Sequence, residues 1–185
     1  MSESNQPRVP EQIPGNAIDP NNIKSAGKLG YISSIICFIP FVNIVGCILV
    51  LISLRRLSRE YRDESIWRNS LRGMIIFIIG GVIGGFVAGI VVENSSFYTT
   101  LQIAAVVAYP FAIVSMRYIR NAYYALAERS GVSNFREAGK WFWRVGLTEI
   151  ILLVSGIFWL VAVYDQMMGF DKLRKLAPFA MAPTS

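Results

Sequence analysis

Long apolar runs separated by charged segments set the pattern of this chain, and they occupy residues 29–54, 73–92, 97–116 and 145–164. A helix that crosses the hydrocarbon core of a bilayer needs about 20 residues, each rising about 1.5 Å. Each run reaches that length. The pattern therefore predicts an all-α integral membrane protein, with a four-span domain over residues 29–166.

The composition agrees with this prediction. The chain is 54% hydrophobic and 16% charged, and charged residues are almost absent from the runs. This segregation is expected in a membrane, where a charge at the bilayer centre is costly. The alternative is a soluble bundle whose core helices are the runs, but their length and unbroken apolar character argue against it.

The two ends of the chain are polar. Residues 1–28 hold four prolines and few large apolar side chains, so we expect an extended or disordered tail with no secretory signal. Residues 167–185 form the second tail. Within it, Lys172, Arg174 and Lys175 alternate with apolar residues, which predicts a short amphipathic surface helix over 170–179.

Basic residues gather between the first and second runs and between the third and fourth. They are Arg55, Arg56, Arg59, Arg62, Arg68 and Arg72 in the first segment, and Arg117, Arg120, Arg129, Arg136, Lys140 and Arg144 in the second. The positive-inside rule then places both loops in the cytoplasm and both termini outside the cell membrane. Pro40 and Asn43 interrupt the first run, and a re-entrant first run would move the N-terminus inside.

The two basic loops resemble each other. Residues 65–70 (SIWRNS) and 133–138 (SNFREA) share a serine, an aromatic residue and an arginine at the same spacing, which suggests two duplicated helical hairpins in parallel orientation. Asp63 is expected to cap the helix that enters the second run. In the second basic loop, Gly131 is expected to end the helix that continues from the third run. Near the loops, aromatic residues are expected at headgroup depth as interface anchors rather than as a ligand cage. These are Trp67, Trp141 and Trp143, with Phe142 between the last two.

Residues 61–69 (YRDESIWRN) and 130–139 (SGVSNFREAG) resemble the two hallmark loops of a family of small multi-pass membrane proteins. That family is mostly archaeal and is catalogued only as a domain of unknown function. The resemblance covers about residues 28–166. It implies a multi-pass membrane fold and an archaeal source, and it supplies no activity, cofactor or catalytic residue.

The second run carries a stripe of glycines. Gly81, Gly85 and Gly89 recur every fourth residue, so one helix face is nearly bare and another helix can approach it closely. Packing against spans of the same chain is the favoured interpretation. Contact with a different subunit is the alternative.

Polar residues inside the apolar runs are the default place to look for function. Asn43 lies in the first run, and Glu149 is the one acid inside any run. Glu149 lies close to Arg144 in sequence, so it can reach toward the cytoplasmic face and pair there. A proton or cation site at Glu149 is the alternative.

The absence of certain residues excludes several chemistries. The chain has no histidine, which removes the usual zinc, copper and haem ligand sets and His-based catalysis. Cys37 and Cys47 lie ten residues apart, which on one helix is about 15 Å, too far for a disulfide. No catalytic residue, cofactor or metal is therefore expected. The net charge of +6 points to anionic headgroups rather than nucleic acid.

These observations predict that the chain is not an enzyme. We expect a non-catalytic accessory or structural subunit of a larger membrane complex. A respiratory or other energy-converting complex is one host that would suit it. One alternative is a small transporter or channel that uses Glu149 and Asn43. Another is a lipid-binding or membrane-shaping protein that works through the basic loops.

Overall fold

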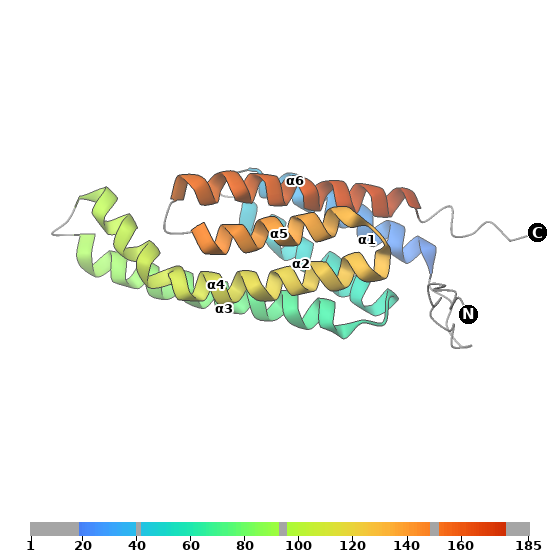
Figure 1. Ribbon diagram of the computed structural model, residues 1–185, viewed down its shortest axis with the longest axis horizontal. Coiled ribbons are helices and arrows are strands. Elements are labelled where there is room, and N and C mark those ends of the chain that lie inside the picture. The colour runs from blue at the N-terminus through green and yellow to red at the C-terminus, as the bar shows by residue number, and fades with distance from the viewer. Residues whose placement is uncertain (1–18, 40–41, 93–95, 149–151, 177–185) are drawn as a thin grey trace, which may run out of the picture.

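A computed structural model describes residues 19–39, 42–92, 96–148 and 152–176, and this part of the chain folds into six α-helices (Figure 1). They are α1 (Pro20–Cys37), α2 (Asn43–Glu60), α3 (Glu64–Val91), α4 (Phe97–Ser130), α5 (Ser133–Thr148) and α6 (Leu152–Leu176). Consecutive helices pair as the hairpins α1–α2, α3–α4 and α5–α6, and α1 also packs against α6. The all-α prediction is confirmed.

Two of the apolar runs do not form single helices. The run over 29–54 is divided between α1, which ends at Cys37, and α2, which begins at Asn43. Pro40 lies between them in the sequence, and a proline lacks the N–H that a continuous helix needs. The run over 145–164 is divided in the same way between the end of α5 and the start of α6. Within the described residues, the four apolar runs are therefore distributed over six helices, which range from 16 residues in α5 to 34 in α4.

Among the described residues, two helices are long and apolar enough to cross a membrane. They are α3 over Glu64–Val91 and α4 over Thr99–Ser130, with mean hydropathies of 2.6 and 1.6 in their most apolar windows. Only 11% and 22% of those windows are buried inside the chain, whereas the core helix of a soluble protein would be mostly buried. Membrane association is thus supported by two helices, and the predicted four-span arrangement is not confirmed.

Both described ends of the chain lie beside the basic loops. Asn22, near the start of α1, donates a hydrogen bond from Nδ2 to Glu60 Oε1 at 2.9 Å. Lys172, near the end of α6, donates from Nζ to Asn134 Oδ1 at 2.7 Å. The sequence had placed the termini opposite these loops. The arrangement differs because the first and last apolar runs each turn back on themselves.

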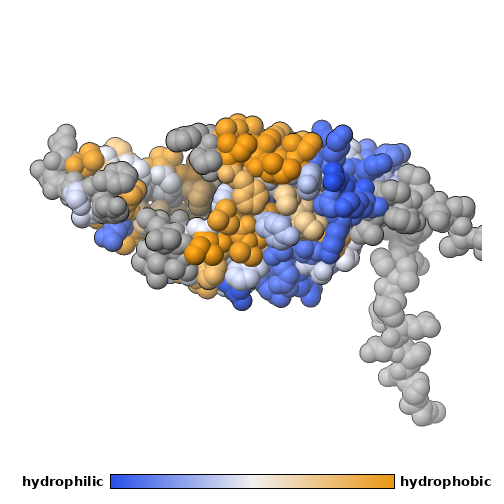
Figure 2. Space-filling model, turned by 90° about the horizontal axis from the view of Figure 1, so that it is seen from above, coloured by the Kyte–Doolittle hydropathy of each residue, from blue (hydrophilic) through white to orange (hydrophobic). Residues whose placement is uncertain are grey.

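We call this region the polar end; it comprises the start of α1, the α2–α3 and α4–α5 loops and the end of α6. Hydrophilic residues gather there in Figure 2, and apolar residues dominate the surface next to it.

The tails are more helical than expected. Helix α1 already begins at Pro20, and Asp19 caps it by accepting a hydrogen bond from Asn21 N at 2.8 Å. An Asp cap followed by proline is a common helix start. At the other end, Phe170 and Leu173 are 0% and 2% exposed on α6. They belong to the core rather than to the amphipathic surface helix expected over residues 170–179.

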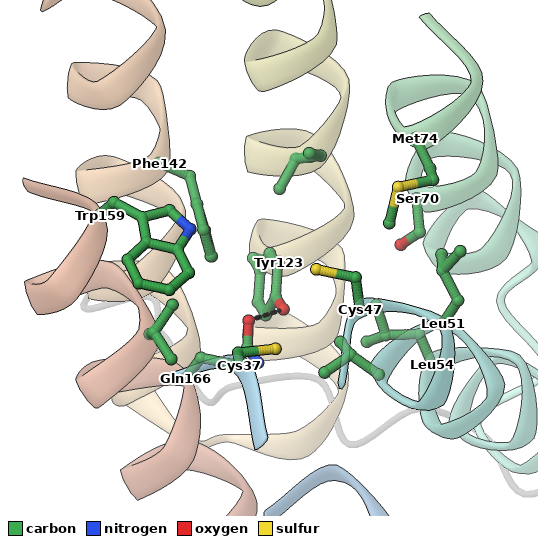
Figure 3. A pocket seen from close by; sticks show the side chains of 13 residues that line it. Cys37, Cys47, Leu51, Leu54, Ser70, Met74, Tyr123, Phe142, Trp159 and Gln166 are labelled. Atoms are coloured by element: carbon green, nitrogen blue, oxygen red, sulfur yellow. Dashed lines mark hydrogen bonds between the residues drawn. The ribbon is translucent and has the colours of Figure 1, made fainter. Parts of the chain in front are cut away.

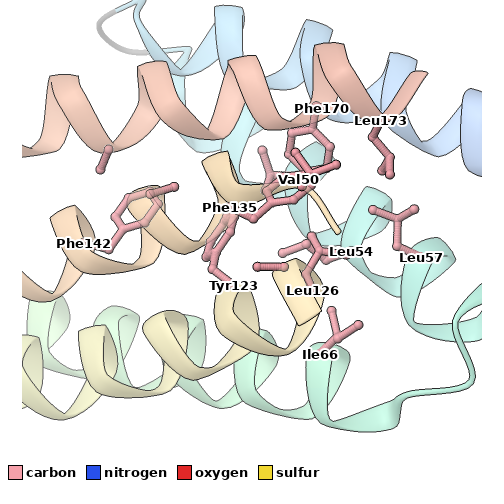
Figure 4. Close-up of a cluster of buried hydrophobic side chains, with 14 of the residues drawn as sticks. Val50, Leu54, Leu57, Ile66, Tyr123, Leu126, Phe135, Phe142, Phe170 and Leu173 are labelled. Carbon is pink, nitrogen blue, oxygen red and sulfur yellow. The ribbon is translucent and has the colours of Figure 1, made fainter. Parts of the chain in front are cut away.

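The best-packed part of the core lies near the polar end (Figure 4). The Phe135 and Phe170 rings meet edge to face with centroids 5.1 Å apart, and neither side chain is exposed. A Cβ on Gly169 would lie 2.7 Å from the Phe135 ring, so this contact requires glycine. Phe142, expected at headgroup depth, is also buried in this core.

The loop signals seen in the sequence are confirmed. Asp63 is the N-cap of α3, and its Oδ1 accepts a hydrogen bond from Ser65 N at 3.0 Å. Gly131 ends α4 with a φ of 69°, the left-handed conformation that favours glycine. These two turns position α3 and α5.

Candidate functional site

A cavity of about 90 Å³ lies between the six helices and has a mainly apolar lining (Figure 3). Met74, Trp159 and Val163 contribute apolar walls, and Cys37 and Cys47 line it from α1 and α2. This volume can hold a small molecule or a few waters. No group of three or more acids, histidines and cysteines suited to a metal ion occurs in the described part of the chain.

One side of the cavity carries a chain of buried hydrogen bonds. Tyr123 Oη donates to Gln166 Oε1 at 2.5 Å, and Gln166 Nε2 donates to Ser34 Oγ at 2.8 Å. Ser34 Oγ donates onward to the Gly30 carbonyl oxygen at 2.8 Å. Satisfied buried networks of this kind specify a unique packing. The chain ties α4, α6 and α1 together, so its first role is structural.

Sequence reasoning did not identify this network. Gln166 lies just beyond the fourth apolar run, as the last residue of the predicted four-span domain. Tyr123 lies in a segment interpreted as a cytoplasmic extension of a span. No local signal links these residues, because the contact joins positions 43 residues apart.

The two cysteines meet across the α1–α2 hairpin. Both are free thiols, and both side chains line the same cavity, Cys37 from α1 and Cys47 from α2. Cys37 Sγ lies 2.7 Å from the position that a Cβ on Gly46 would take, so the two helices approach closely here. The expectation that these cysteines lie about 15 Å apart on one helix is therefore wrong.

Asp63 links the α2–α3 loop to α4. Asp63 caps α3 through Oδ1, and its Oδ2 accepts a hydrogen bond from Arg129 Nε at 3.0 Å. Partial burial works to raise the pKa of Asp63, but the hydrogen bonds from Ser65 and the Arg129 guanidinium outweigh it. The net effect holds the pKa of this carboxyl below its ordinary value.

Asp171 plays a similar part at the end of α6. Its carboxylate accepts a hydrogen bond from Lys175 Nζ at 2.5 Å and also pairs with Arg174. Arg174 in turn lies over the Tyr31 ring of α1, 4.2 Å from its centroid. The Lys175 hydrogen bond is the main reason that the pKa of Asp171 lies below its ordinary value; burial opposes it, and Arg174 adds to it.

Acid is therefore expected to destabilise the polar end. A carboxyl whose pKa is lowered by folding contributes stability above its unfolded pKa, and that stability is lost as the pH falls through the folded pKa. Lowering the pH from 7 to below the ordinary aspartate value of 3.8 should reduce the thermal midpoint in detergent. Asp63→Asn should lower the midpoint slightly at pH 7, because asparagine can still cap α3 but has no charge to pair with Arg129, and a partly exposed ion pair contributes about 0.2–1 kcal/mol. It should also weaken the pH dependence.

Glu64→Gln is the matched control, because Glu64 is an exposed neighbouring acid. An Asp63→Asn variant with the same pH profile as the wild type would contradict the role given to Asp63.

Each tryptophan expected to anchor the protein at headgroup depth carries an arginine over its ring. From guanidinium carbon to ring centroid, the pairs are Arg55 with Trp67 at 5.3 Å, Arg144 with Trp141 at 4.2 Å and Arg120 with Trp143 at 4.9 Å. Cation–π pairs and interfacial tryptophans both suit a region where apolar and charged surroundings meet. The role of these tryptophans as anchors stays a prediction.

The glycines of α3 divide between two faces. A Cβ on Gly80 would lie 2.5 Å from Phe111, and one on Gly84 would lie 3.0 Å from the Ala104 carbonyl oxygen, so these two glycines pack against α4. A Cβ on Gly81, Gly85 or Gly89 would meet nothing within 4 Å. The sequence favoured packing of this stripe against other spans of the same chain. Among the described residues, no helix packs against it.

The two polar residues expected inside the membrane, Glu149 and Asn43, lie at or beside breaks between described segments. Glu149 lies outside the described residues. Asn43 is the first residue of α2, and the structure does not describe its side chain. The structure thus brings the two cysteines together, whereas a proton or cation site at Glu149 and Asn43 stays a prediction.

Comparison with known proteins defines the class. A family model described as "Protein of unknown function (DUF996)" matches residues 42–163. The chain belongs to this family, which confirms the resemblance seen in the loops. A relative, the uncharacterized protein MJ1644 of the archaeon Methanocaldococcus jannaschii, is 22% identical over 165 residues, covering 82% of this chain and 93% of the relative. No solved structure matches the chain.

Proposed function

We propose that this protein is a non-catalytic structural subunit of a larger membrane assembly, held to its partner through the outer face of α3. The observation that carries this proposal is the stripe of Gly81, Gly85 and Gly89, which no other helix of the described chain covers.

The arrangement of the helices in the membrane follows from their apolar lengths. Residues 73–91 of α3 extend about 28 Å, close to the thickness of the hydrocarbon core, and α4 returns beside it. The apolar part of α2, residues 43–54, extends only about 18 Å. In this proposal α3 and α4 span the bilayer, while the α1–α2 and α5–α6 hairpins enter to about half its depth.

The positive-inside rule then puts the whole polar end in the cytoplasm. Both basic loops and the basic residues near the described ends share that side, including Lys28 and Arg174. This sidedness replaces the earlier expectation of external termini, and it needs no charged residue to cross the membrane.

The outer half of α3 suits a helix of another membrane protein. Small residues at every fourth position let two helix backbones approach closely, which favours association in lipid. Large side chains flank the stripe: Val82, Phe86 and Ile90 are 66%, 71% and 63% exposed. A partner helix lying on the glycines would pack between these side chains. Nothing in the stripe is reactive, which favours assembly over catalysis.

Replacing Gly85 tests the proposal. We expect Gly85→Leu to reduce the stoichiometric partner recovered with the tagged protein from its native membrane by about tenfold or more, since overpacking a close contact typically costs 1–3 kcal/mol. The measurement is quantitative mass spectrometry of the gently extracted complex, with thermal stability measured in parallel.

Gly156→Leu on α6 is the matched control, because a Cβ there also meets nothing within 4 Å. Recovery of the wild-type protein without any stoichiometric partner, or unchanged recovery of the partner with Gly85→Leu, would contradict the proposal. The transporter alternative rests on Glu149 and Asn43, and no described contact favours it.

A further inference from the structure

The seam between α4 and α5 holds an arginine between two aromatic rings. The Arg120 guanidinium carbon lies 4.9 Å from the Trp143 centroid and 5.7 Å from the Tyr124 centroid. Arg136 of α5 approaches the same Tyr124 ring at 5.9 Å. A Cβ on Gly139 would lie 3.0 Å from that ring, so the two helices close tightly beneath these arginines. Two guanidinium groups are therefore oriented by one aromatic pair.

Acids on this seam already have partners. Glu128 lies 3.7 Å from Arg136, and Glu137 accepts a hydrogen bond from Lys140 at 2.7 Å. Arg120 has no carboxylate within ion-pair distance among the described residues, and its buried Nε has no hydrogen-bond partner there. Buried donors, above all those of a charged group, normally have partners. The seam thus offers a fixed positive group that has no counter-ion among the described residues.

The surface changes character at Arg120. It lies ten residues before the end of α4, which is about 15 Å below the polar end. Deeper along the seam Val106 and Leu147 are 59% and 46% exposed, and Arg117 of α4 and Arg144 of α5 add exposed positive charge close to Arg120. There Tyr109 Oη donates a hydrogen bond to the Leu147 carbonyl oxygen at 3.2 Å, which joins the two helices. A charged group above an apolar strip is the pattern of a lipid headgroup above its acyl chains.

The geometry points to a binding site for the phosphate headgroup of an anionic phospholipid on the α4–α5 seam. The phosphate oxygens accept hydrogen bonds from the Arg120 guanidinium. Arg136, which pairs with Glu128, lies beside it on the same Tyr124 ring. Trp143 and Tyr124 hold the guanidinium in place, and the acyl chains lie along Val106 and Leu147. The inference is independent of the proposed function, because it rests on α4 and α5 rather than on the glycine face of α3.

The test uses the full chain in nanodiscs of phosphatidylcholine with increasing phosphatidylglycerol, and native mass spectrometry counts the phosphatidylglycerol retained. Arg120→Gln should weaken retention about tenfold or more, because hydrogen bonds to charged groups are individually strong. Arg72→Gln is the matched control, since Arg72 is an exposed arginine on α3 and the charge change is the same. Arg120→Lys keeps the charge but loses the planar fork, and it should restore binding only in part.

Equal weakening by Arg120→Gln and Arg72→Gln would overturn the site in favour of general surface attraction, and so would full retention by Arg120→Gln. Thermal midpoints of the variants, measured without phosphatidylglycerol, establish that each is folded.

A second arm of the experiment distinguishes a lipid phosphate from free phosphate. Inorganic phosphate at matched ionic strength should not displace the lipid, because the acyl chains contribute to binding. Displacement by inorganic phosphate would assign the site to a free anion and overturn the lipid proposal.

Discussion

Mild oxidation of the purified protein with diamide is expected to join Cys37 to Cys47 within one chain. Both cysteines line one cavity, and Cys37 Sγ lies 2.7 Å from the position that a Cβ on Gly46, the residue before Cys47, would take. A disulfide needs Cα atoms within about 7 Å. Diamide takes up the two hydrogens that the thiols lose, so the intact mass should fall by two hydrogens and neither cysteine should then react with an alkylating reagent. Most molecules should be cross-linked, and reduction should reverse the reaction.

Cys37→Ser is the control for this experiment, because it leaves Cys47 without a partner. A wild-type protein that keeps both thiols after oxidation, while Cys47 still reacts with a small alkylating reagent, would contradict the hairpin. Residues 29–54 would then form the single helix that their hydropathy alone predicts. This experiment therefore distinguishes a re-entrant hairpin from a spanning helix.

Phe135→Ala is expected to cause the largest loss of stability of any single truncation discussed for this protein. Phe135 is fully buried, meets Phe170 at 5.1 Å and lies against Gly169. Removing a buried phenylalanine side chain typically costs about 3–5 kcal/mol, a large share of the 5–15 kcal/mol typical of a domain. The thermal midpoint in detergent should fall by about 10 °C.

Phe86→Ala provides the matched comparison, since it makes the same change at a residue of α3 that is 71% exposed. Its midpoint in detergent should stay close to that of the wild type. Similar losses for the two variants would mean that the Phe135–Phe170 contact is not the centre of the core.

Local signals in the sequence were sufficient for much of the helical framework. The period and length of the apolar runs located α3 and α4, because a spanning helix must satisfy its own backbone and present apolar side chains throughout. Asp63 and Gly131 were identified from their capping preferences, which depend on a few neighbouring residues. The two loops also carried enough pattern for the family to be identified.

Contacts between distant segments could not be predicted in the same way. The sequence favoured packing of the Gly81, Gly85 and Gly89 stripe within the chain. The fold instead packs Gly80 and Gly84 against α4 and leaves that stripe uncovered. Hydropathy measures the cost of exposure to water, and it does not distinguish a lipid-facing side chain from one facing another helix. The Tyr123–Gln166–Ser34 network was missed for a related reason, since its members lie on three helices.

The sequence by itself therefore determined that the chain is helical, that α3 and α4 are apolar enough to cross a membrane, where its charges concentrate and where two loops turn. The tertiary structure alone decided that residues 29–54 and 145–164 fold back, which brings Cys37 to Cys47 and both described ends to the basic loops. The physical reason is that a break in an apolar helix is stabilised by packing against other helices, and that packing energy belongs to pairs of distant residues.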